Sequence, residues 1–207
     1  MSEQKTAADR VDNFTDNVIA VIITIMVLGL KAPGYPGFAA LLPLWPTAIS
    51  YAVSYLFIAI IWLNHHHLLR FVEHTTPALI WVNFAHLFAV SLVPSATIWV
   101  TRTVSAAVPV AFYACVFVCV NLAYLVFVRH VLNQTDGTRI AEHLRRLTRR
   151  RSSATLVIFA SAVVVSLFAP RAGFALICCA LLPYLTPEVP SAWLRRSRPY
   201  LAGNRRT

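Results

Sequence analysis

Charged residues are scarce in this chain. Asp, Glu, Lys and Arg make up 13% of its 207 residues, and only eight residues are acidic. Hydrophobic residues make up 58%, and the mean hydropathy is +0.65. A soluble domain of this length could not bury so much apolar surface. The composition therefore excludes a soluble globular protein and indicates an integral membrane protein.

The sequence also lacks the patterns of several functional classes. No zinc-finger spacing or RNA-binding signature accompanies its basic residues, so the net charge of +10 does not indicate a nucleic-acid partner. No nucleophile with a base, and no metal site with an open position, is visible, which argues against an enzyme. The four cysteines have no zinc-site context and are expected to pack as small apolar residues. The first apolar stretch has no convincing cleavage site after it, so we expect it to remain as a membrane helix.

Uncharged apolar stretches predict an all-α protein with six transmembrane helices. They cover 17–30, 32–69 with a turn at 33–37, 77–101, 103–128, 152–170 and 172–187. Several are shorter than the roughly 20 residues that a spanning helix needs, but each can extend into flanking polar turns. The sixth is the least regular, because it contains Pro183 and Pro187.

Basic residues predict the orientation. With six spans, fifteen of the 18 Lys and Arg fall on the side that holds both termini, and positive residues mark the cytoplasmic face. The predicted organisation is a cytoplasmic amino-terminal tail at 1–9, a transmembrane domain at 10–190 and a basic cytoplasmic tail at 191–207. Within the transmembrane domain, the arginine-rich cytoplasmic loop 129–152 is expected to contact anionic lipid headgroups.

Polar residues gather where the first three predicted spans reach the cytoplasmic face. The simplest interpretation is a hydrogen-bonded lock, in which Asp16 accepts and Arg10 donates while histidine, indole and amide groups fill the other positions. The residues that topology places in this layer are Arg10, Asp16, Trp62, Asn64, His65, His66, His67, Asn83 and His86.

A metal site and a transport site are two other interpretations of this layer. Successive helical residues point about 100° apart, so the three contiguous histidines at 65–67 cannot all face one ion. A metal between Asp16, His66 and His86 is the remaining arrangement, but carboxylates are few, and we predict neither a metal nor another cofactor. A secondary ion or proton-coupled transporter that uses Asp16 and the histidines is the alternative function, although no repeat of broken helices accompanies it.

The first apolar stretch carries a stripe of side chains at three- and four-residue steps. A polar entrance followed by β-branched or Leu rings is what a hydrophobic pore constriction requires when symmetric copies face an axis. One chain has too few polar residues to line a pore alone, so a conducting pathway needs several subunits. The stripe consists of Asn17, Val21, Thr24 or Ile25, and Leu28.

Four motifs in order resemble the bacterial members of the transmembrane protein 175 family of potassium channels. They are Arg10-x-x-x-Phe14-Thr15-Asp16, Ile-Thr-Ile-Met-Val-Leu at 23–28, Trp62-x-x-His65-His66, and Asn83 followed by Leu-Val-Pro-Ser at 92–95. The resemblance covers residues 10 to about 98. The family's usual triplet is Phe-Ser-Asp, and Thr15 keeps the hydroxyl here.

The resemblance implies a homotetramer in the bacterial cytoplasmic membrane, with the first helix of each subunit lining a central pore that prefers potassium to sodium. Potassium is then the permeant ion, and no Thr-Val-Gly-Tyr-Gly filter is present. Val21, Ile25 and Leu28 align with the rings of the constriction, Thr24 offers hydroxyls, and Asn17 lies at the inner mouth. The family's inner lock corresponds to Arg10, Phe14, Thr15, Asp16, Trp62, His65, His66 and Asn83.

Overall fold

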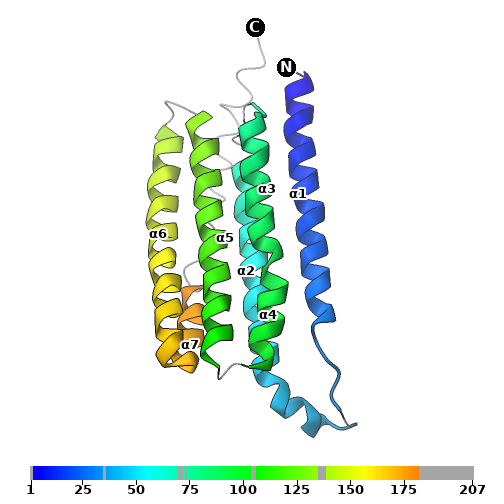
Figure 1. The fold of residues 1–207 in the computed structure, drawn as a ribbon. Helices are drawn as coiled ribbons and strands as arrows, with labels where there is room; N and C mark the ends of the chain where they lie inside the picture. Colours follow the sequence, from blue (N-terminus) through cyan, green and yellow to red (C-terminus); the bar gives the residue numbers. More distant parts are fainter. Residues whose placement is uncertain are drawn as a thin grey trace.

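The fold is a bundle of long, nearly parallel helices. The structure, a computed structural model, describes residues 2–34, 36–69, 72, 74–103, 106–134 and 139–181. The predicted tail 191–207 and the end of the predicted sixth span lie outside these residues. Figure 1 shows α1 at one edge of the bundle and α6 at the opposite edge. The elements are α1 (Ser2–Leu28), η1 (Phe38–Leu44), α2 (Trp45–Leu69), α3 (Pro77–Ser91), α4 (Val93–Arg102), α5 (Ala107–Gln134), α6 (Arg139–Phe168) and α7 (Pro170–Ala180).

Five helical segments of the described chain are long and apolar enough to cross a membrane. Each coincides with one of the first five predicted spans, and the shorter apolar helix α7 lies where the sixth was predicted. The chain is therefore an all-helical, multi-pass membrane protein. The five segments are Ala7–Leu28, Phe38–Leu69, Pro77–Arg102, Ala107–Gln134 and Arg150–Phe168.

The polar segments are more helical than predicted. Helix α1 already begins at Ser2, within the predicted tail 1–9. Helix α5 continues to Gln134 and α6 begins at Arg139, so most of the predicted loop 129–152 is helical. Arginine is a good helix former, and a helix continues beyond the membrane wherever no proline or glycine stops it. Charge indicates where a span ends, but it does not indicate where its helix ends.

Prolines and one cap set the breaks within the bundle. Thr76 caps α3, because its Oγ1 accepts a hydrogen bond from the Leu79 N–H at 3.1 Å. The third span divides at Leu92 into α3 and α4, with Pro94 in the first turn of α4. Pro170 opens α7 directly after α6. Proline lacks an N–H and is tolerated only in a first turn, so each of these prolines follows a helix end.

Aromatic rings from three helices form the centre of the apolar core. Phe57 of α2 stacks on Phe117 of α5, with ring centroids 4.0 Å apart, and Phe159 of α6 meets Phe117 edge-on at 5.2 Å. A buried hydroxyl network lies beside them, where Ser54 Oγ is 2.7 Å from Thr97 Oγ1 and 2.6 Å from the Tyr113 hydroxyl. Helix α5 thus ties α2, α4 and α6 together.

We expect Gly173→Ala to destabilise the protein by about 1–2 kcal/mol, because it overpacks the contact between α6 and α7. A Cβ at Gly173 would lie 2.9 Å from the Ser166 Cα, which is backbone and cannot move aside alone. The measurement is the thermal unfolding midpoint of the purified protein in detergent. Gly34→Ala is the control, since a Cβ there meets nothing within 4 Å. Equal midpoints for the two variants would contradict the close approach.

Candidate functional site

One face of α1 is bare, that is, its side chains are exposed in the single chain. Val21, Ile25 and Leu28 are 54%, 48% and 79% exposed, and Asn17 and Thr24 are exposed on the same side. These five residues form the stripe that the sequence predicted. Because α1 stands at the edge of the bundle (Figure 1), none of the other described helices covers them.

The opposite face of α1 is packed. Thr15, Ile19, Ile22 and Met26 are buried and follow one another at three- and four-residue steps. This face contacts α2, α3 and α4. Helix α1 is therefore held to its own chain along one side, and its other side is free to meet lipid, water or another subunit.

A chain of buried hydrogen bonds holds the packed face near its amino-terminal end. The Asn83 Nδ2 of α3 donates to Thr15 Oγ1 at 2.9 Å, and Thr15 Oγ1 donates to the Val11 carbonyl at 2.9 Å. On the other side, His65 Nε2 of α2 lies 2.8 Å from Asn83 Oδ1. A carbonyl oxygen only accepts, so His65 carries its proton on Nε2. Three helices are thus joined by one chain of hydrogen bonds.

The imidazole of His65 is also stacked between rings. Its centroid lies 4.4 Å from that of Phe127 at an interplanar angle of 11°, and 5.6 Å from that of His86 at 4°. Phe127 belongs to α5, and sequence reasoning did not include it. Phe127 lies within an apolar run of α5 and has no polar group of its own, so its role follows only from the packing of α5 against α2 and α3.

A second, half-exposed cluster joins α1 to α2 beside this chain. Trp62 Nε1 donates to Asp16 Oδ1 at 2.7 Å, and the Trp62 indole stacks on the His66 ring with centroids 5.8 Å apart. His66 Nδ1 lies 3.4 Å from Asp12 Oδ2. Asp12 was not among the predicted site residues. Its position one turn before Asp16 on the same helix face was the available signal.

The predicted pair of Arg10 and Asp16 is not formed, which corrects the proposed lock. Asp16 accepts from Trp62 instead, and Arg10 is exposed and makes no ion pair with any described residue. Six residues on a helix correspond to about 240° of rotation, so the two side chains leave α1 in different directions.

The metal arrangement of Asp16, His66 and His86 is likewise not formed. His86 stacks on His65 in the interior, whereas His66 faces the carboxylates of α1. Among the described residues, the group whose ligand atoms approach one another is Asp12, Asp16 and His66. The polar layer thus divides into a buried chain around His65 and a half-exposed cluster around His66.

Phe14, the aromatic residue of the predicted triplet, faces away from both clusters. Its ring lies 5.3 Å from that of Phe84 on α3, and both side chains remain partly exposed. This pair adds an apolar contact between α1 and α3 on the outside of the hydrogen-bonded chain. The residues of the triplet 14–16 therefore each meet a different partner.

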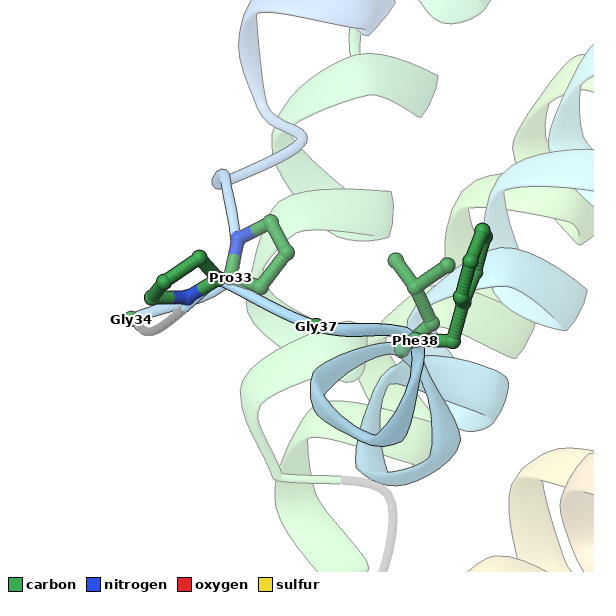
Figure 2. Close-up of a pocket in the computed structure, with 6 residues that line it drawn as sticks. Pro33, Gly34, Gly37 and Phe38 are labelled. Atoms are coloured by element: carbon green, nitrogen blue, oxygen red, sulfur yellow. The ribbon is translucent and has the colours of Figure 1, made fainter.

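A hollow of about 550 Å³ lies at the opposite end of α1. Figure 2 shows it beside the segment that connects α1 to η1, with Pro33 and Phe38 among its walls. It is open and lined mainly by apolar side chains and glycine backbone. None of the described residues that line it has a titratable side chain. The candidate site is the bare stripe and polar layer of α1.

Proteins named potassium channels are similar to this chain. A protein named potassium channel from Chryseobacterium sp. (strain P1-3) is 29% identical over 180 residues, which are 86% of this chain and 93% of that protein. Another of that name from Streptomyces collinus (strain DSM 40733 / Tue 365) is 34% identical over 123 residues, 56% of this chain and 60% of its own length.

A solved structure has the same fold. It is the crystal structure of a lysosomal potassium-selective channel TMEM175 homolog from Chamaesiphon minutus, which matches 89% of this chain and 100% of its own with a TM-score of 0.79 and 21% identity. The family described as endosomal/lysosomal potassium channel TMEM175 matches residues 10–94, the segment that contains the stripe and the polar layer. Over residues 10–94 the chain is thus similar to the TMEM175 family, and it shares the fold of the solved homolog.

Proposed function

We propose that this chain forms a potassium-selective, leak-type channel as a homotetramer in the bacterial cytoplasmic membrane, with both termini on the cytoplasmic side. The observation that carries the proposal is the bare stripe of α1 at 17, 21, 24, 25 and 28, opposite a face packed against the same chain. Four such stripes around an axis would enclose a pore, and closed rotational symmetry is the usual way to supply them. The match of residues 10–94 to the TMEM175 family and the relatives named potassium channels support the choice of ion.

The constriction is proposed to consist of rings of Val21, Ile25 and Leu28. Apolar rings resist the passage of water and hydrated ions, so their radius and wetting set the conductance. Potassium sheds its water more readily than sodium, which gives such a ring a preference without a carbonyl filter. Asn17 lies one turn toward the cytoplasmic side of Val21, where it would form the inner mouth.

Thr24 is proposed to offer oxygen atoms between the rings. Its Oγ1 donates its hydrogen to the Val21 carbonyl at 2.8 Å, within its own helix. The lone pairs that remain on this oxygen point away from the donated hydrogen, so they can face a cation on the exposed side. A ring of four such hydroxyls would partly replace the water that a potassium ion loses.

The polar layer is proposed to hold the pore helix rather than to bind the permeant ion. Thr15, Asn83 and His65 are buried and already use one another as hydrogen-bond partners. A transporter that used this layer would need these groups to be accessible to its ion. Their burial argues against an ion site formed by these three residues.

The deciding experiment is planar-bilayer recording from purified, reconstituted protein under a potassium gradient, followed by replacement of potassium with sodium on one side. Unitary currents that reverse near the potassium potential are expected. The same protein, reconstituted into lipid vesicles, is then used for a flux assay under imposed sodium and proton gradients. Coupled exchange with a fixed stoichiometry and no unitary current would contradict the channel and support a transporter.

We expect chemical cross-linking of the protein in native membranes to yield a ladder that ends at four subunits of 23.0 kDa each. The reason is geometric, because the stripe on α1 is covered only when several copies surround an axis. Gel electrophoresis after a time course of cross-linking measures this. The control is the same reaction after solubilisation in a denaturing detergent, where only single chains are expected. A ladder that stops at two in native membranes would contradict the tetramer.

A further inference from the structure

The half-exposed cluster between α1 and α2 has the composition of a metal site. Asp12 and Asp16 lie four residues apart on α1 and therefore share a face, and His66 of α2 meets them across the helix contact. One ligand atom from each of the three residues lies within 4.8 Å of the others. Two carboxylates and one imidazole are a ligand set that divalent transition metals accept.

The spacing between His66 and Asp12 also suits two ligands of one ion. Their Nδ1 and Oδ2 atoms are 3.4 Å apart, whereas a charge-assisted hydrogen bond brings such atoms to about 2.7–2.9 Å. Ligand atoms of a tetrahedral zinc ion lie about 2.0–2.1 Å from the metal, and so about 3.3–3.4 Å from one another. The observed separation is thus also that of two ligands on one ion.

Neighbouring groups orient the carboxylates for a ligand. Trp62 Nε1 donates to Oδ1 of Asp16, which fixes that carboxylate and leaves its Oδ2 for another partner. The Oδ1 of Asp12 is buried and has no hydrogen-bond partner among the described residues. A buried carboxylate oxygen without a donor is costly, and a cation is one way to satisfy it. The His66 and Asp12 side chains remain 29% and 26% exposed, so an ion can reach them.

We infer that Asp12, Asp16 and His66 bind a divalent transition-metal ion of the zinc class, with water in the fourth position. Magnesium and calcium are not expected, because they prefer six or more oxygen ligands and an imidazole nitrogen suits zinc better. A bound ion would join the pore-lining helix α1 to α2 next to Asn17. Asp12 is not among the motif residues that carry the resemblance to potassium channels, so the site is inferred from this chain's own residues.

The test is calorimetric titration of tag-free, purified full-length protein in detergent with zinc chloride. One zinc ion per chain is expected for the unaltered protein. Asp12→Asn and His66→Gln are each expected to lower the affinity at least about tenfold, and Trp62→Phe about tenfold through the lost orientation of Asp16. The control is His74→Gln, which removes an exposed histidine elsewhere in the described chain and is expected to leave the affinity unchanged.

Cobalt provides a second measurement that separates ligation from nonspecific adsorption. Cobalt in a tetrahedral site absorbs visible light strongly, and this band is expected in the unaltered protein and absent in His66→Gln. The site is excluded if no stoichiometric binding occurs, or if Asp12→Asn and His66→Gln both retain it. Both titrations are made without any current, so their outcome does not depend on the proposed channel function.

Discussion

Ile25→Ala is expected to raise the single-channel conductance severalfold and to bring the potassium-to-sodium permeability ratio close to one. Ile25 is exposed on the bare face of α1, one turn beyond Val21. The substitution removes three carbon atoms from each of four copies around the proposed axis, so the ring widens and admits water more readily. Potassium and sodium can then both pass with their water, so the different cost of losing water no longer discriminates between them. Bilayer recording in potassium and in mixed solutions measures both quantities.

A matched control separates the pore from general effects of the protein surface. Val21→Ala is expected to act in the same direction as Ile25→Ala, and less strongly because valine is smaller. Val164→Ala removes the same two methyl groups as Val21→Ala from an equally exposed position, since Val164 is 57% exposed and Val21 54%. Val164 lies on α6, at the far edge of the bundle from α1 (Figure 1). If Val164→Ala changed selectivity as much as Ile25→Ala, α1 would not line the pore.

The sequence predicted the membrane class and the bare stripe because both depend on simple periodicities. Apolar runs bounded by charges locate five spans, and steps of three and four residues place Val21 and Leu28 on one face. Depth also placed His65 and Asn83 in one predicted layer, and they are in contact, whereas Thr15 was expected there only from the family resemblance. Depth restricts the possible partners of a polar residue to those of one layer.

Depth does not determine which members of a layer pair with one another. Arg10 and Asp16 carry opposite charges at the same end of α1, yet the rotation of the helix separates them and Trp62 takes the carboxylate. Asp12 precedes the first apolar stretch, and its contact with His66 depends on how α1 packs against α2. Phe127 could not be identified at all, because its role depends on how α5 packs against α2. Rotation and packing are tertiary properties, and local sequence determines them only weakly.

Asn83→Ala is expected to destabilise the folded protein by about 2–4 kcal/mol and to reduce the yield of the assembled channel. The variant removes the donor to Thr15 and the acceptor for His65, and interhelical hydrogen bonds of this kind contribute about 0.6–1.7 kcal/mol each in membranes. The empty volume left in a buried position adds a further cost of roughly 1 kcal/mol. Unfolding in detergent, followed through the loss of helical circular dichroism, measures the change.

The same variant decides whether the polar layer positions α1 or conducts. Asn13→Ala is the control, because it removes the same amide from an exposed position of α1 and is expected to change stability by less than about 0.5 kcal/mol. If the layer only positions the helix, the Asn83→Ala channels that do assemble keep the permeability ratio of the unaltered protein, because the rings of α1 are intact. A stable, abundant Asn83→Ala protein with altered permeability ratios would instead place Asn83 on the ion's path. The hydrogen-bonded chain would then contribute little to folding, and Asn83 would contribute directly to selectivity.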